Sequence, residues 1–321
     1  MTKLIQAVEL SKYFRVGKQN YLHAVDKVSF DIEQGTTLGV VGESGCGKST
    51  LGRVVLGLLP ATSGELYYNG ENLLTKKKKE LKAVRRDMQI VFQDPYASLN
   101  PRMSVYELIA EPLVMNHVYK SKREVLDRVT SLMEIVGLAE RFINSYPHEM
   151  DGGRRQRVGI ARALALNPKF VVCDEPVSAL DVSIQAQILN LLMDMQDEMK
   201  LTYMFITHDL SVVKHISDEI MVMYLGQCVE KAPAGELFKN PMHPYTKALL
   251  SAIPVPKLGA SLQQNLLRGE VSDPINPGVG CRFAKRCDFC KETCTQQDFP
   301  LKECGDRHFV ACALYDEQKK D

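Results

Sequence analysis

Short apolar runs alternate with amphipathic stretches through the first 235 residues. Each apolar run has the length and composition of a buried strand, as in "TLGVV" (37–41), "KFVVCD" (169–174), "TYMFI" (202–206) and "EIMVMYLG" (219–226). The segment "SIQAQILNLLMDMQDEMK" (183–200) has the apolar spacing of a helix. Strands that alternate with helices predict an α/β fold with a mainly parallel sheet covered on both sides.

Two stretches depart from this alternation. "SGELYYNGENL" has a strand-like start followed by Asn69-Gly70, a strong hairpin signal. Residues 104–160 are helical almost throughout, and "SVYEL" offers Ser104 as a cap with Glu107 three residues later. We therefore expect a separate helical subdomain at about residues 95–160.

Composition narrows the class of protein. The 321 residues carry a formal net charge of +1, which argues against a dedicated nucleic-acid binder. Apolar runs stay shorter than the ~20 residues of a membrane-spanning helix, and the start "MTKLIQAVEL" lacks the apolar region of a secretory signal. We expect an intracellular chain whose nine cysteines are thiols or metal ligands.

A phosphate-binding loop follows the first buried strand. "GESGCGKST" fits the pattern G-x-x-x-x-G-K-[ST], and it precedes a helix, as the pattern requires. Lys48 is expected to reach the β- and γ-phosphates, the Ser49 hydroxyl to coordinate Mg²⁺, and Thr50 to add a phosphate contact. The residues assigned to nucleotide binding here are Gly42, Glu43, Ser44, Gly45, Cys46, Gly47, Lys48, Ser49 and Thr50.

Two adjacent carboxylates end the strand "FVVCDE". Asp174 is expected to hold the metal, directly or through water, and Glu175 to polarise an attacking water. The loop and this acidic pair together predict a nucleoside triphosphatase that uses Mg²⁺, and the motifs alone do not identify the nucleotide.

Residues 3–235 resemble the ATP-binding subunit of an ABC transporter. "VFQDP" places Gln93 at the Q-loop glutamine, "SALD" places Asp181 in the D-loop, and "ITHDL" places His208 at the switch histidine. "LSKYF" places Phe14, with Tyr13 as the less favoured choice, where an aromatic ring stacks on adenine. The resemblance implies a RecA-like P-loop core with an antiparallel β subdomain, and it makes Gln93 a metal and water sensor.

The family's signature segment, L-S-G-G-Q, corresponds here to Met150 followed by Asp151, Gly152, Gly153 and Arg154. In the family this segment contacts the γ-phosphate of an ATP that a second subunit holds. Two interpretations of Asp151 stay open. It replaces serine simply as a helix cap, or its charge weakens the shared ATP site, with Arg154 or Arg155 offsetting part of the repulsion.

A weakened signature predicts an asymmetric pair. The chain's own loop, Glu175 and His208 match the family pattern, so we expect one competent site with a partner whose signature is intact. The second ATPase subunit is therefore predicted to be a different protein.

Six cysteines crowd into the C-terminal end, where thiolates at such spacing suit zinc or an iron–sulfur cluster. The segments "NPMHPYTKALLSAIP" and "GCRFAKRC" resemble the extension of peptide and nickel importers. That resemblance implies a small domain at 236–321, after an ATPase domain at 1–235. It implies a [4Fe–4S] cluster, with zinc as the alternative, on Cys281, Cys287, Cys294 and Cys312.

Cys290 and Cys304 fall outside the pattern. A Pro- and Gly-rich connecting arm is expected beyond Phe238. Because the extension lies far in sequence from the phosphate chemistry, we expect it to have a structural role.

The resemblance implies an ATPase that energises oligopeptide or dipeptide import at the cytoplasmic face of the membrane. Two permease subunits and an extracellular binding protein would complete the complex, and no nucleic acid is expected. Nickel or oligosaccharide import is the alternative. A soluble ABC ATPase without a transport role is less favoured, because the chain has neither two nucleotide domains nor a coiled-coil insertion.

Overall fold

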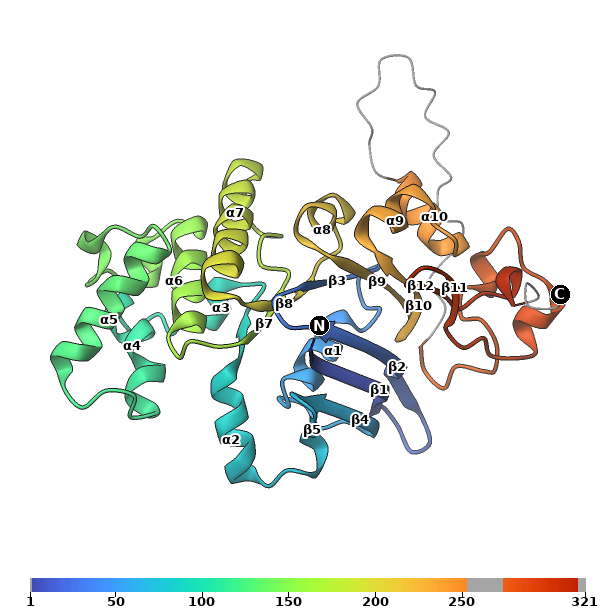
Figure 1. The fold of residues 1–321 in the computed structure, drawn as a ribbon, viewed down its shortest axis with the longest axis horizontal. Helices are drawn as coiled ribbons and strands as arrows, with labels where there is room; N and C mark the ends of the chain where they lie inside the picture. The colour runs from blue at the N-terminus through green and yellow to red at the C-terminus, as the bar shows by residue number, and fades with distance from the viewer. Residues whose placement is uncertain (1, 253–273, 317–321) are drawn as a thin grey trace, which may run out of the picture. The chain divides into compact units, whose positions relative to one another are not determined.

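The structure is a computed structural model, and it describes residues 2–252 and 274–316 (Figure 1). Residues 33–36 and 75–206 form one compact unit. A second unit contains residues 2–32 and 37–74 and the chain from residue 207 onward. The C-terminal extension thus clusters with the phosphate loop and does not form a unit of its own.

The first unit contains three parallel strands in the order β8-β7-β6. Every residue of β7 and β8 is buried, as expected for the apolar runs at these positions. The strands are β6 (Met88–Val91), β7 (Phe170–Asp174) and β8 (Thr202–Ile206).

Helices make up most of the rest of this unit, and α4, α5 and α6 pack against one another (Figure 1). Ser104 caps α4 as predicted, because its hydroxyl accepts from the Glu107 N–H while the Glu107 carboxylate accepts from the Ser104 N–H. The helices are α2 (Lys78–Asp87), α3 (Pro95–Ser98), α4 (Val105–Met115), α5 (Lys122–Ile135), α6 (Gly152–Leu164) and α7 (Val182–Met199).

The second unit begins with a four-stranded sheet in the order β2-β1-β4-β5. Asn69 and Gly70, with φ of 49° and 82°, form the predicted turn between β4 and β5. The left-handed backbone at both residues is what such a turn requires. The strands are β1 (Lys3–Arg15), β2 (Tyr21–Glu33), β4 (Ser63–Tyr68) and β5 (Glu71–Asn72).

Five further strands of this unit lie in the order β11-β12-β10-β9-β3. The pair β3 and β9 is parallel, but β10, β12 and β11 add an antiparallel edge. These elements are β3 (Thr37–Val41), β9 (Glu219–Tyr224), β10 (Gln227–Pro233), β11 (Lys302–Gly305) and β12 (His308–Val310). The helices are α1 (Lys48–Val55), α8 (Leu210–Ile216), α9 (Ala234–Lys239) and α10 (Pro244–Ser251).

The segment predicted to be a connecting arm contains a helix. Pro244 occupies the first turn of α10, where its missing N–H does no harm, and His243 caps the helix by accepting from the Tyr245 N–H. The proline signal was therefore a helix start. Residues 253–273 of the predicted arm lie outside the described residues, and its last part lies against β2, where Ile275 forms a β-bridge with Leu22.

One buried carboxylate joins two distant parts of the extension. Glu230 of β10 accepts from the backbone N–H groups of Met242 and His243 at 2.8 Å, and it lies 2.7 Å from His308 Nε2. Glu230 and His308 are both buried, and a buried charge is tolerated only when it is satisfied in this way. The extension is therefore anchored on β10.

Candidate functional site

The phosphate loop connects β3 to α1 in the second unit, as predicted. The buried Lys48 ammonium donates to the backbone oxygens of Gly42 and Glu43 at 2.7 and 3.0 Å. Gly42, Gly45 and Gly47 all have positive φ, at 151°, 78° and 104°. The loop therefore has the curved backbone that directs amides toward an anion at the start of a helix.

The residue before His208 is hydrogen-bonded to the strand that precedes the phosphate loop. The N–H of Thr207 donates to the oxygen of Val40 in β3 at 3.1 Å. His208 follows Thr207 and is exposed. The backbone just before the predicted switch histidine is therefore held against β3.

Phe14 is half-buried at the end of β1, with the Lys12 ammonium 5.0 Å from the centre of its ring. Tyr13 is engaged elsewhere. Its hydroxyl donates to Asp26, and its ring stacks on His23 with 3.9 Å between ring centres. This engagement of Tyr13 favours Phe14 as the ring available to adenine.

The first unit brings Gln93 and Glu175 together. Gln93 Nε2 donates to a Glu175 carboxylate oxygen at 2.8 Å, although the two residues are far apart in sequence. Glu175 follows the buried Asp174, and its N–H donates to the Ile206 oxygen at 2.9 Å. The φ of Glu175 is 46°, a conformation that non-glycine residues rarely adopt and that is concentrated at functional sites.

Asp151 caps α6. Its carboxylate accepts from the Arg154 N–H at 2.8 Å, and the Arg154 guanidinium lies 3.2 Å from the other carboxylate oxygen. The Arg154 guanidinium also lies over the Phe142 ring. Arg155 instead donates to the Met150 oxygen. Of the two arginines, Arg154 is thus the one that partly neutralises Asp151.

The two glycines of this segment also allow close packing within the chain. A Cβ on Gly153 would lie 2.7 Å from the Ile184 side chain of α7, and a Cβ on Gly152 would lie 3.2 Å from Leu180. Leu180 precedes Asp181, the exposed D-loop residue at the start of α7. The glycine pair therefore lets α6 start in close contact with the D-loop and α7.

The C-terminal extension contacts the phosphate loop, although the two lie far apart in sequence. Arg286 forms two hydrogen bonds with the Glu43 carboxylate, at 2.7 and 3.1 Å, and the Tyr245 hydroxyl accepts from the Glu43 N–H at 2.9 Å. The Arg286 side chain is 5% exposed. Both α10 and the cysteine-rich segment therefore fold back onto the loop.

Arg286 and Tyr245 are site residues that the motif search missed. Both residues lie in the segments that resemble the family's extension, Tyr245 in "NPMHPYTKALLSAIP" and Arg286 just before Cys287. The resemblance gave no role to either residue. Nothing in the local pattern pairs either residue with Glu43.

The cysteines of the extension gather without forming a ligand set. Burial, together with the neighbouring Cys312, Cys294 and Cys287, raises the pKa of the Cys281 thiol to about 12. In residues 2–252 and 274–316, however, no three His, Cys, Asp or Glu side chains are arranged to hold a metal ion. The thiols as placed are neighbours and do not converge on one point.

The described part of the chain also contains no helix with the length and hydrophobicity needed to span a bilayer.

Comparison with known proteins defines the class. The family model described as "ABC transporter" matches residues 25–178, and that described as "Oligopeptide/dipeptide transporter, C-terminal region" matches residues 229–294. Among solved structures, the dimeric post-hydrolysis ATP-binding cassette MJ0796 bound to ADP and Pi is 30% identical, with a TM-score of 0.66, and covers 72% of this chain and 98% of its own. CbiO1 from Clostridium perfringens, part of the ABC transporter complex cbiONQ, has a TM-score of 0.67 at 28% identity over 75% and 92% of the two chains. The chain is thus an ABC ATPase with a P-loop α/β fold, and it hydrolyses ATP.

Curated relatives extend over nearly the whole chain. The putative oligopeptide transport ATP-binding protein YkfD of Bacillus subtilis is 51% identical over 97% of this chain and 95% of its own. OppF of Salmonella typhimurium, an oligopeptide transport ATP-binding protein, is 51% identical over 98% and 96%. DppF of Haemophilus influenzae, a dipeptide transport ATP-binding protein, is 51% identical over 97% and 96%. The chain belongs to the family of oligopeptide and dipeptide transport ATP-binding proteins.

Proposed function

We propose that this chain hydrolyses ATP to energise the import of oligopeptides or dipeptides. The observation that carries the proposal is the 51% sequence identity to peptide-transport ATP-binding proteins. This similarity extends through the ATPase segment and the C-terminal segment alike. The chain would work at the cytoplasmic face of the membrane, with two permease subunits and an extracellular binding protein. Nickel or oligosaccharide import remains the alternative.

Within this function, Lys48 binds the β- and γ-phosphates and Phe14 stacks on adenine. Mg²⁺ prefers oxygen ligands, so the Ser49 hydroxyl, the Asp174 carboxylate and the Gln93 amide oxygen each have the chemistry of a ligand for it. Bound Mg²⁺ would neutralise charge on the phosphates. Glu175 would then accept a proton from the attacking water while Gln93, hydrogen-bonded to it, orients the carboxylate.

The dimer in which the chain works is proposed to be asymmetric. Asp151 would place a carboxylate beside the γ-phosphate of the partner's ATP. Like charges at ~4 Å repel by about 1 kcal/mol in water and about 4 kcal/mol at an effective dielectric near 20. The Arg154 side chain, 44% exposed, offsets only part of that because exposed ion pairs are weak.

The Asp151 charge can be separated from its capping role by substitution. Asp151→Asn keeps a good helix cap and removes the charge. We expect this variant alone to hydrolyse ATP about tenfold faster than the wild-type chain alone, because the repulsion in both shared sites is removed. Steady-state phosphate release measures this rate.

The wild-type chain mixed with an ATPase subunit whose segment reads L-S-G-G-Q serves as the reference for one intact shared site. Asp151→Ala removes cap and charge together, and thermal unfolding separates lost stability from lost charge. Full activity of the wild-type chain as a homodimer would rule out the asymmetric arrangement.

We further propose that Cys281, Cys287, Cys294 and Cys312 hold a [4Fe–4S] cluster, with one zinc ion as the alternative. The support is the resemblance to the family's extension and the proximity of the four thiols, three of which add to the effect of burial in raising the pKa of Cys281. Their side chains would have to turn toward a common centre for this.

Anaerobically purified full-length protein is expected to contain about four irons and four sulfides per chain and to be brown. Cys287→Ser is expected to lose the iron, whereas Cys304→Ser, outside the pattern, keeps it. About one zinc without colour would select the alternative, and protein free of both metals would eliminate the site.

A further inference from the structure

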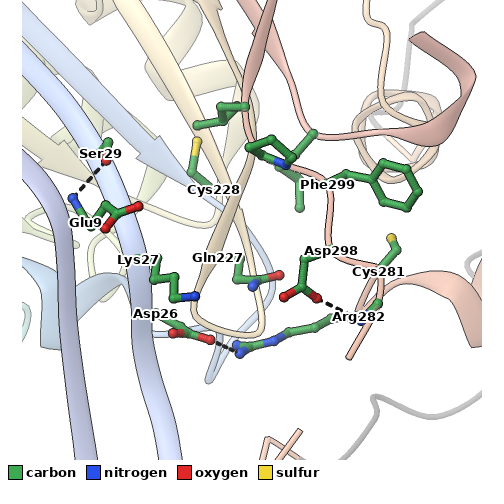
Figure 2. A pocket seen from close by; sticks show the side chains of 15 residues that line it. Glu9, Asp26, Lys27, Ser29, Gln227, Cys228, Cys281, Arg282, Asp298 and Phe299 are labelled. Carbon is green, nitrogen blue, oxygen red and sulfur yellow. Dashed lines mark hydrogen bonds and ion pairs between the residues drawn. The ribbon is translucent and has the colours of Figure 1, made fainter. Parts of the chain in front are cut away.

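The cysteine-rich turn, residues 281–287, carries an arginine beside each of its two end cysteines. Arg286, at the end of a short 3-10 helix (Ala284–Arg286), pairs with Glu43 of the phosphate loop. Arg282 pairs with Asp26 of β2 and donates to the Leu225 oxygen (Figure 2). The turn is therefore attached to the nucleotide-binding part of its own unit at two points.

Packing determines where the turn lies. Phe283, between the two arginines, is 2% exposed, and its ring centre lies 5.3 Å from that of Tyr224 and 5.4 Å from that of Tyr245. Arg286 also donates to the Tyr224 hydroxyl at 3.3 Å. This aromatic cluster joins the turn to β9 and α10, so Arg286 reaches Glu43 from a rigid support.

The second attachment involves Tyr13, the neighbour in sequence of Phe14, whose ring is predicted to stack on adenine. Asp26 accepts from the hydroxyl of Tyr13, the residue before Phe14, as well as from Arg282. A cavity of about 340 Å³ beside this pair is lined by Asp26, Cys281, Arg282 and others. Figure 2 shows the Arg282 side chain extending across its edge to Asp26.

Glu43 is the single acidic residue of "GESGCGKST". An unpaired carboxylate in a loop that binds a polyanion would weaken binding in one of two ways. It repels the phosphates, or it captures the Lys48 ammonium, which already lies 3.0 Å from the Glu43 backbone oxygen. A bidentate guanidinium prevents both the repulsion and the capture of Lys48, because it neutralises the carboxylate and fixes its direction.

We propose that the cysteine-rich turn positions the phosphate loop, and that Arg286 is the positioning residue, acting through the Glu43 carboxylate. The proposal rests on the placement of ATP in Gly42–Thr50. Tyr245 completes the support, because its hydroxyl fixes the direction of the Glu43 N–H. The ATP site of this chain is thus completed by its own C-terminal extension.

Binding of the non-hydrolysable analogue AMP-PNP with Mg²⁺ to the full chain, measured by calorimetry, tests this. Arg286→Met is expected to raise the Kd about tenfold, less than a fully buried pair would give, because the Glu43 side chain is 25% exposed. Adding Glu43→Gln to Arg286→Met removes the unpaired charge and is expected to return the Kd to within about threefold of wild type. Arg307→Met, which breaks the ion pair between the half-exposed Arg307 side chain of the extension and Glu219 of β9, is expected to change the Kd less than twofold.

The competing outcomes are distinct. Wild-type affinity in Arg286→Met, or no recovery in the double variant, overturns the positioning role. Should Arg286→Met fail to fold, Arg286→Lys keeps the charge but loses the bidentate geometry, and a Kd raised about threefold supports the role while wild-type affinity contradicts it. If Lys48→Ala binds AMP-PNP as well as wild type, the ATP site itself is misplaced, which is a different failure.

Discussion

Replacement of Glu175 by glutamine is expected to lower ATP turnover about 10²- to 10³-fold, within the range that general-base catalysis contributes. Glutamine keeps the size of the side chain and an oxygen that accepts the 2.8 Å hydrogen bond from Gln93. What it loses is the ability to take a proton from water. ATP binding should be retained, so kcat falls and the affinity for the nucleotide changes little.

The control for this prediction is Glu9→Gln. Glu9 has the same φ as Glu175, 46°, but it lies in β1 and takes no part in the proposed chemistry. Its replacement should leave turnover unchanged. That result would show that removing a glutamate from a left-handed backbone position does not by itself lower ATP turnover. Steady-state phosphate release and AMP-PNP binding together measure both effects. Turnover by Glu175→Gln within threefold of wild type would exclude Glu175 as the base.

The sequence predicted the phosphate loop and the strand before it because both are local. Five consecutive residues of β3 are buried, and the glycine pattern follows directly. The carboxylates after β7 are local in the same sense. Periodicity and spacing carry such features, since neighbours along the chain determine them.

The contact between Arg286 and Glu43 is of the opposite kind, because it joins residues 243 positions apart. No periodicity links an arginine in a cysteine-rich turn to an acid in a phosphate loop. The same limit applies to the hydrogen bond between Gln93 and Glu175. The strand-end acidic pair predicted Glu175 and the resemblance supplied Gln93, but neither supplied their contact. Tertiary packing decides such pairs, and the sequence shows only the candidates.

The signature segment lies between these cases. The sequence left two interpretations of Asp151 open, a helix cap only or a weakened phosphate contact, and the structure shows the cap. The second role depends on another subunit and stays a prediction. Gly153 has a reason within the chain as well as its predicted role beside the partner's ATP. A Cβ at this position would lie 2.7 Å from the Ile184 side chain, which would have to move.

Gly47→Ala is expected to weaken ATP binding by about tenfold to hundredfold and to destabilise the fold. A Cβ on Gly47 would lie 1.9 Å from the backbone oxygen of Ala24 in β2, so one of the two backbones must move. The φ of 104° adds strain for any residue with a side chain. Strain of about 1–3 kcal/mol in a loop that must keep its shape corresponds to that loss of affinity.

Gly70→Ala is the matched control. Gly70 also has a positive φ, 82°, but nothing lies within 4 Å of its Cβ position, and it belongs to the hairpin between β4 and β5. This variant should lose stability through backbone strain while its Kd for AMP-PNP stays within twofold of wild type. Equal losses of affinity in the two variants would show that general destabilisation, and not the displaced phosphate loop, weakens binding.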